Sequence, residues 1–181
     1  MLVPPKSAPG ILQRDPAIVG ALVVALAGAA TIAGAWFFQL VIGLPPCPLC
    51  LEQRWFYYIG IPLALLIAFA AWRGAPRRVS GVGLILLALV MLAGAGLATY
   101  HAGIEWKWWP GPQECSGPLP PPSAGGLLKQ LESVAIVRCD EIPWQFLGLS
   151  LAGWNALISL GLALVSLAAA RVTFRSDLRT R

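Results

Sequence analysis

The sequence predicts an all-α membrane protein: a four-transmembrane-helix bundle with a long outer loop that carries a short amphipathic helix. Composition is the first reason, because 57% of the 181 residues are hydrophobic and 12% are charged, with a mean hydropathy of +0.72. The second reason is a set of four apolar stretches, each near or above the roughly 20 residues that cross a hydrocarbon core. These spans are about 17–44, 55–72, 79–100 and 149–170. Little sequence remains outside them, so residues 1–181 are expected to form a single membrane domain.

The third reason is the placement of positive charge. The net charge of +5 alone is compatible with nucleic-acid binding, but the basic residues flank the spans. One side of the predicted bundle carries nine of them: Lys6, Arg14, Arg73, Arg77, Arg78, Arg171, Arg175, Arg179 and Arg181. The other side carries four, offset by acidic residues: Arg54, Lys107, Lys129 and Arg138. By the positive-inside rule, both termini and the link at 73–78 are cytoplasmic. The outer loops are then about 45–54 and 101–148, and no nucleic-acid partner is expected.

The first apolar stretch has an alternative interpretation as a cleaved signal peptide. Ala33-Gly34-Ala35 has the small residues of a cleavage site. The apolar run is, however, longer than a usual signal-peptide core and continues to Leu44. An uncleaved first span is therefore favoured.

All four cysteines, Cys47, Cys50, Cys115 and Cys139, fall in the predicted outer loops, where disulfides persist. The Cys47-Pro48-Leu49-Cys50 pair precedes a long apolar run, and Pro48 suits the first position of a helix. The dipole of that helix favours a thiolate on Cys47. Arg54 follows Cys50 by one helical turn, where a cation can stabilise a thiolate or a reduced oxygen on a bound acceptor. The pattern suggests electron transfer between thiols and a molecule in the lipid.

Other interpretations of these residues remain open at this point. The four cysteines are enough for a zinc site, although Cys115 and Cys139 lack the second tight pair that such sites usually show. A structural disulfide within four residues would be strained, and Arg54 alone is compatible with a snorkelling interface anchor. A c-type haem needs His directly after the second cysteine, where this chain has Leu51.

Aromatic and polar residues near the outer interface add to this pattern. The run Trp55 to Tyr58 is interpreted as an aromatic belt, with the alternative that it flanks a flat ring. His101 ends the third span; it is either an ordinary interfacial side chain or a group at the depth of Cys50 that hydrogen-bonds a carbonyl oxygen or moves a proton. Asn155, in the fourth span, is expected to make an interhelical hydrogen bond.

The long outer segment holds the second pair of cysteines. Prolines around Cys115 favour an extended chain, which a partner with its own dithiol can attack. Residues 127–137 have apolar side chains at helical spacing and predict a short amphipathic helix, either on the membrane surface or against the bundle. Arg138 would lower the pKa of Cys139, whereas Asp140 and Glu141 oppose this.

Taken together, the chain resembles the disulfide bond formation protein B (DsbB) family of bacterial inner-membrane oxidoreductases. The resemblance covers nearly the whole length and rests on an ordered set of motifs: Cys47-Pro48-Leu49-Cys50 with Arg54, Tyr100-His101, Cys115, Cys139, and Trp144-Gln145-Phe146-Leu147-Gly148-Leu149. A lone CxxC would be weak, but the full set on one side of four spans is specific. Pro48 occupies a position that varies in the family, which leaves the redox potential of the pair undetermined.

The resemblance implies a role for each of these residues. A periplasmic DsbA-like thioredoxin-fold oxidase, once reduced, would attack the Cys115–Cys139 disulfide and form a mixed disulfide with Cys115. Electrons would then pass to Cys47 and Cys50, and Cys50 would engage a membrane quinone, either ubiquinone or menaquinone. Arg54 would sit beside the quinone, as would His101. Electron transfer from DsbA through DsbB to a quinone is known to keep the bacterial periplasm oxidising.

Three rival functions stand beside this one. The vitamin K epoxide reductase family also combines a four-helix core with two cysteine pairs, but its quinone-side pair comes late in the chain. A reductase running electrons outward needs a route across the membrane, and no cysteine lies in any predicted span. A structural tetraspan protein with a disulfide-stapled outer loop would have inert cysteines and would not respond to quinone.

Overall fold

The computed structural model describes residues 15–112 and 138–179, and every structural statement below concerns these. The elements are α1 (Pro16–Leu40), α2 (Pro48–Trp72), α3 (Arg77–Glu105), β1 (Gln145–Phe146), β2 (Leu149–Ser150) and α5 (Leu151–Arg179). All four helices are long and apolar enough to cross a membrane. The predicted all-α four-span bundle is therefore confirmed, while the amphipathic helix predicted at 127–137 lies outside the described residues.

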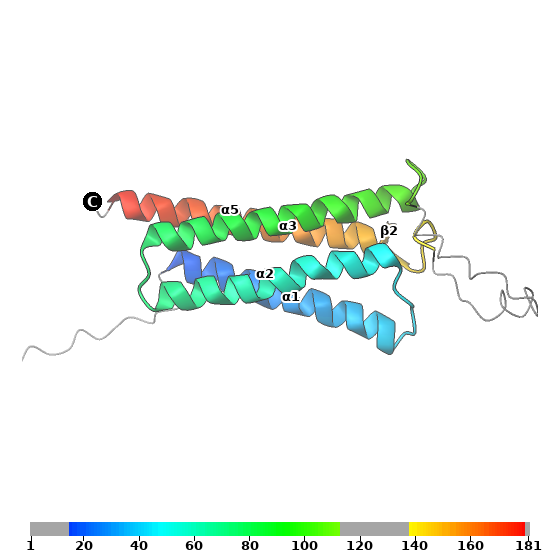
Figure 1. Ribbon diagram of the computed structural model, residues 1–181, viewed down its shortest axis with the longest axis horizontal. Coiled ribbons are helices and arrows are strands. Elements are labelled where there is room, and N and C mark those ends of the chain that lie inside the picture. Colours follow the sequence, from blue (N-terminus) through cyan, green and yellow to red (C-terminus); the bar gives the residue numbers. More distant parts are fainter. Residues whose placement is uncertain (1–14, 113–137, 180–181) are drawn as a thin grey trace, which may run out of the picture.

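The four helices run antiparallel to their chain neighbours, with α3 and α5 above α1 and α2 in the view of Figure 1. The link between α2 and α3 lies at one end of the bundle, together with the start of α1 and the end of α5. The connection from α1 to α2 and the short β-strands lie at the other end. The basic residues Arg73, Arg77 and Arg78 are thus separated by the length of the bundle from Cys47.

Helices α2 and α3 extend further than the predicted spans 55–72 and 79–100, toward the end of the bundle that carries Cys47. Helix α2 begins at Pro48, as its sequence indicates, because Cys47 is its N-cap and the Cys47 sulfur accepts a hydrogen bond from the Cys50 N–H at 3.2 Å. Helix α3 continues to Glu105, just before Lys107 takes a left-handed conformation with φ of 61°. Residues expected in the outer loops therefore belong to helices, which gives their side chains a rigid support.

Small residues allow close packing at the other end. A Cβ atom added to Gly20 of α1 would lie 2.4 Å from the Cβ of Ala169 of α5, so these two helices touch almost backbone to backbone. The main core continues through buried side chains of all four helices, including Val24, Leu84 and Met91. Large apolar side chains such as Leu26 and Leu66 point outward, as expected for a surface that faces lipid.

A short β-hairpin, whose two strands have two residues each, precedes α5 and was not predicted. Strands β1 and β2 pair antiparallel, with Gln145 opposite Ser150 and Phe146 opposite Leu149. The turn residues Leu147 and Gly148 have φ values of 52° and 79°, the left-handed pair that a tight type I′ turn needs. The Trp154 side chain of α5 donates a hydrogen bond to the Phe146 carbonyl at 3.0 Å, which fixes the hairpin on the helix.

Candidate functional site

The dithiol lies at the start of α2. The Cys47 and Cys50 sulfurs are 2.7 Å apart; Cys47 is 3% exposed and Cys50 is half-buried. The hydrogen bond with Cys50 raises the pKa of Cys47, and burial raises it further. The helix dipole was expected to favour a thiolate on Cys47, but the Cys50 sulfur and burial oppose this, because two sulfurs this close share one charge. The pair is positioned to close a disulfide or to pass on two electrons.

His101 of α3 lies directly against this pair. Its Nε2 atom is 3.6 Å from the Cys47 sulfur, and the side chain is 3% exposed. The interpretation of His101 as an ordinary interfacial side chain is thus wrong. Its position beside the dithiol agrees with the alternative, in which His101 lies at the depth of Cys50 and hydrogen-bonds a carbonyl oxygen or moves a proton.

A chain of polar side chains leads from His101 into the bundle. The Gln53 amide nitrogen is 2.8 Å from Nδ1 of His101, and the Gln53 oxygen accepts from the Asn155 amide at 2.6 Å. The Asn155 oxygen accepts from the Tyr57 hydroxyl at 2.6 Å, and that hydroxyl also contacts Ser159 at 2.8 Å. The interhelical hydrogen bond predicted for Asn155 is confirmed. Tyr57 is buried rather than part of the expected aromatic belt.

Sequence analysis missed Gln53 altogether. The available signal was helical spacing, since Gln53 and Tyr57 follow Cys50 by three and seven residues and so share its helix face.

Arg54 is buried on the neighbouring face of α2, with 8% of its surface exposed. One guanidinium nitrogen donates to the Gln39 side chain at 2.8 Å, and the group lies over the Trp36 ring at 5.2 Å. It forms no ion pair with a carboxylate of the described residues. A snorkelling anchor would reach solvent, so this burial favours a binding role. A guanidinium has five N–H donors, which leaves donors for an acceptor atom nearby.

Arg54, Cys50 and His101 all line one cavity of about 430 Å³ between α1, α2, α5 and the hairpin. The volume is within the range of small-molecule sites, about 300–1,000 Å³. Its walls are largely apolar, and five aromatic side chains contribute to them: Phe38, Tyr57, Trp144, Phe146 and Trp154. The Phe38 and Trp144 rings are 4.9 Å apart, and Trp144 stacks with Phe146 at 6.0 Å. A flat ring would thus be flanked mainly by these residues, and of the run Trp55 to Tyr58 only Tyr57 lines the cavity.

Cys139 is buried in a small apolar cluster with Cys47, Leu49 and Ile104. It is disulfide-bonded, and its backbone carbonyl accepts a hydrogen bond from the His101 ring. The structure thus brings three of the four cysteines and His101 together. Cys115 lies outside the described residues.

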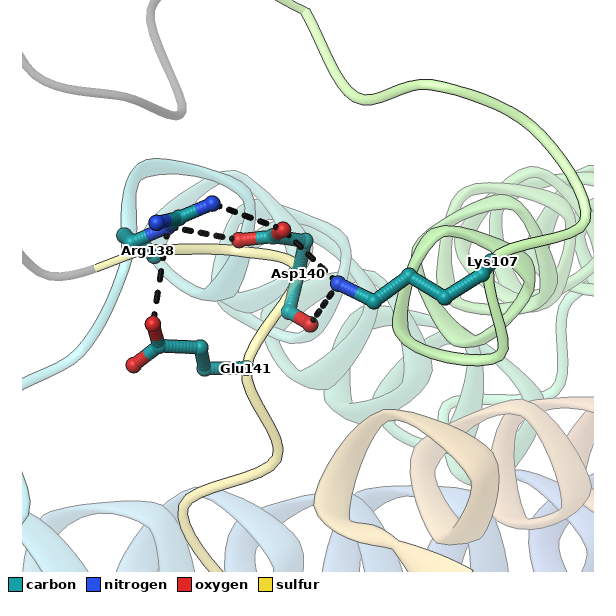
Figure 2. Close-up of polar contacts among 4 residues, drawn as sticks. All are labelled: Lys107, Arg138, Asp140 and Glu141. Carbon is teal, nitrogen blue, oxygen red and sulfur yellow. Dashed lines mark hydrogen bonds and ion pairs between the residues drawn. The ribbon is translucent and has the colours of Figure 1, made fainter.

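An ion-pair group holds the segment that carries Cys139 against the end of α3 (Figure 2). Arg138 makes two contacts of 3.0 Å with the Asp140 carboxylate, and the Lys107 ammonium approaches the same carboxylate at 2.7 Å from the opposite side. Arg138 and then Lys107 lower the pKa of Asp140 to about 2. Arg138 also pairs with Glu141 at 3.5 Å. Its charge is therefore directed at Asp140 and Glu141, the two carboxylates that the sequence analysis expected to oppose its effect on Cys139.

A buried acid, Glu105, closes the same end of the bundle. The Glu105 carboxylate accepts a hydrogen bond from the Ser150 hydroxyl, and the Ser150 hydroxyl oxygen in turn accepts from the Gly153 N–H at 3.1 Å. These bonds join the last residue of α3 to the hairpin and the first turn of α5. The dithiol and the cavity wall therefore share one rigid support.

Zinc fits this arrangement poorly. The sulfurs of Cys47 and Cys50 and one ring nitrogen of His101 lie within 4.8 Å of one another, which is a possible set of three ligands. Two sulfurs on a tetrahedral zinc would be about 3.8 Å apart, given Zn–S bonds of about 2.3 Å, whereas here they are 2.7 Å apart. A four-cysteine site is contradicted because Cys139 is disulfide-bonded.

Comparison with known proteins agrees with this chemistry. The family model described as "Disulfide bond formation protein DsbB" matches residues 18–169. Among curated relatives, Disulfide bond formation protein B of Marinobacter nauticus is 37% identical over 153 residues, which cover 77% of this chain and 86% of that protein. The protein of the same name from Verminephrobacter eiseniae is 34% identical over 171 residues, or 87% of this chain and 89% of that protein. No solved structure was found to match. The chain therefore belongs to the DsbB family of disulfide bond formation proteins, which are membrane oxidoreductases.

Proposed function

We propose that this protein reoxidises a thioredoxin-like dithiol partner and passes the electrons to a membrane quinone. One observation carries the proposal: the Cys47–Cys50 dithiol opens, through Cys50, onto an aromatic cavity that is also lined by the buried Arg54, which pairs with no carboxylate in the described part of the chain. A structural tetraspan protein has no use for a buried cation beside a dithiol, since burying an unpaired charge is costly.

The relay begins with the partner. A partner thiolate attacks Cys115 of the Cys115–Cys139 disulfide; the new bond forms at Cys115, and the electron pair of the broken bond leaves on Cys139. The second partner thiol then releases the partner as a disulfide, leaving both loop cysteines reduced. Exchange between the loops reduces Cys47–Cys50 in the same way. The clustering of Cys139 with Cys47 supports this step, because thiol–disulfide exchange needs direct contact between the sulfurs.

The residues of this chain fit a quinone at the cavity. When bound, a quinone accepts two electrons and two protons, which balances the oxidation of one dithiol. Arg54 would hold a carbonyl oxygen through its remaining donors and would stabilise negative charge there. Phe38, Trp144 and Phe146 would orient the flat ring and exclude water. Cys50, which lines the cavity, is the sulfur positioned to react; His101 lines the same cavity but faces Cys47.

The protein is a multi-pass membrane protein, and we place it in the bacterial inner membrane. Basic residues gather at the end with the α2–α3 link, and the cysteines lie at the other end. The positive-inside rule then supports cytoplasmic termini and periplasmic cysteine loops. The quinone, ubiquinone or menaquinone, would enter from the lipid, and the partner, a DsbA-like thioredoxin-fold oxidase, from the periplasm.

The test is quinone reduction by the purified protein, followed by quinone absorbance, with a reduced thioredoxin-like dithiol protein as donor. Turnover by the wild type that is lost in both Cys50→Ser and Cys115→Ser is expected. Loss in Cys115→Ser alone would contradict the assignment of Cys50 to the quinone. Absence of turnover by the wild type with both ubiquinone and menaquinone would overturn the proposed acceptor. Ser166→Ala is the control, because the Ser166 hydroxyl bonds only to the Leu162 carbonyl of its own helix, at 2.9 Å.

A further inference from the structure

The hydrogen bonds that lead from Tyr57 to His101 all donate in the same direction, toward His101. Tyr57 donates to Asn155, the Asn155 amide donates to Gln53, and the Gln53 amide donates to Nδ1 of His101. Each amide presents its oxygen toward Tyr57 and its nitrogen toward His101. An N–H that points at Nδ1 requires a lone pair on that nitrogen. The single proton of a neutral imidazole must then be on Nε2.

A second contact points to the same tautomer. The His101 ring hydrogen-bonds the backbone carbonyl of Cys139, and a carbonyl only accepts. Nε2 faces the Cys47 sulfur, and since Nδ1 is taken by Gln53, Nε2 is the ring nitrogen left to donate to Cys139, so we infer that it carries the hydrogen. The contact with Cys139 therefore agrees with the tautomer that Gln53 requires.

We propose that Gln53, held in place by Asn155, is a positioning residue that fixes His101 as the Nε2–H tautomer. The one ring hydrogen is then shared between the Cys139 carbonyl and the Cys47 sulfur, and His101 does not take the proton of Cys47. Gln53 acts through His101 and touches no reacting atom of the dithiol. This assignment rests on the proposed function only for its consequence in catalysis; the tautomer itself is a property of the resting protein.

The consequence concerns the electron pair that reaches Cys47. Whenever an attacking thiolate forms a new bond to the sulfur joined to Cys47, the old S–S bond breaks and its electron pair goes to Cys47. The hydrogen bond with Cys50 and then burial raise the pKa of Cys47, which makes it a poor leaving group without help. A donor at Nε2 stabilises the developing thiolate, whereas a lone pair there would repel it.

The chain offers a direct test, because His101 is its only histidine. Protein labelled with ¹⁵N-histidine therefore gives one pair of ring nitrogen signals, and these separate a protonated from an unprotonated nitrogen. The wild type is expected to show an unprotonated Nδ1 and a protonated Nε2. The reverse pattern, or an imidazolium at neutral pH, would overturn the assignment. This measurement needs no quinone and no partner, so it succeeds or fails independently of the proposed function.

Gln53→Glu is the decisive variant, because a carboxylate can only accept at Nδ1. It is expected to place a proton on Nδ1 and to slow thiol transfer through Cys47 by roughly tenfold, the size of one lost charge-assisted hydrogen bond. Asn155→Leu is expected to give a mixture of tautomers, since Gln53 loses its anchor. Ser166→Ala, bonded within its own helix, is the control and should leave the spectrum unchanged. An unchanged spectrum in Gln53→Glu would show that Gln53 does not set the tautomer and would overturn the proposal.

Discussion

The half of the bundle near the α2–α3 link (the link half) packs small residues together, whereas the half near Cys47 (the site half) buries polar side chains around a cavity. In the link half, Gly20 and Ala169 bring two helices into contact, and the Thr173 hydroxyl bonds to the Ala169 carbonyl within its own helix. In the site half, Arg54, His101 and Glu105 are buried and bonded across elements. The comparison suggests that close packing in the link half supports a site half that leaves room for a cavity and its polar side chains.

The largest expected effect is in the site half, on Arg54. Arg54→Met keeps much of the length of the side chain but removes every donor and the charge, so the KM for quinone should rise by about tenfold or more. Quinone titrations at saturating reduced partner measure this. Arg54→Lys should recover only part of the loss, because an ammonium cannot contact Gln39 and a carbonyl oxygen with the same geometry.

The matched control for Arg54 is Arg73→Met, at the other end of the bundle over the Phe69 ring. It should leave the KM unchanged. An unaltered KM in Arg54→Met would remove Arg54 from the cavity's binding function and would leave the contrast between the two halves without its main support.

An intermediate effect is expected in the link half, on stability rather than on activity. Gly20→Leu has no room against Ala169 and should cost about 1–3 kcal/mol through overpacking. Thermal unfolding in detergent, followed by helical circular dichroism, measures the loss, and the KM for quinone should stay the same. Gly161→Leu is the control, because an added Cβ there meets no atom within 4 Å. A raised KM in Gly20→Leu would mean that the two halves are not independent.

The smallest effect is expected at the surface group of Figure 2, where the ion pairs are solvent-exposed and therefore weak. Asp140→Asn removes the carboxylate that Arg138 and Lys107 share, so Cys139 should be held less firmly. Electron entry from the partner should slow by a few-fold at most, with no change in the KM for quinone. Single-turnover oxidation of the partner dithiol separates the two quantities.

The same carboxylate predicts a pH dependence with a definite sign. The pKa of Asp140 is lowered to about 2 in the folded protein, against roughly 3.9 for a free aspartate. Its stabilising contribution is therefore complete above about pH 4 and is lost as the pH falls toward 2. Wild-type protein should lose protection of the 138–141 backbone against hydrogen exchange over this window, and Asp140→Asn should show no such transition. A transition that persists in the variant would have to come from another group.

The sequence was sufficient for those features that depend on composition and local spacing. Long apolar stretches predicted the four helices, and the CxxC pair with Arg54 one turn later predicted a redox site at one end. The network around Gln53 was not predictable in this way, because Asn155 is 102 residues away and which faces meet depends on how the helices pack. Tyr57 was misread for the same reason, since an aromatic run at an interface does not show which member turns inward. The hairpin was missed because Leu147, a non-glycine residue, takes a left-handed conformation.

One consequence follows from how short the chain is between Cys139 and the cavity wall. Only five residue steps separate Cys139 from Trp144, which packs on Phe38 across the cavity. Fully extended, five residues reach about 17 Å. In the proposed relay, Cys139 would therefore work on a tether of limited length, anchored in the same wall that would hold the electron acceptor. Any partner that draws Cys139 beyond that radius must pull on Trp144, so the length of chain between them sets how far thiol exchange can proceed before the acceptor's pocket is disturbed.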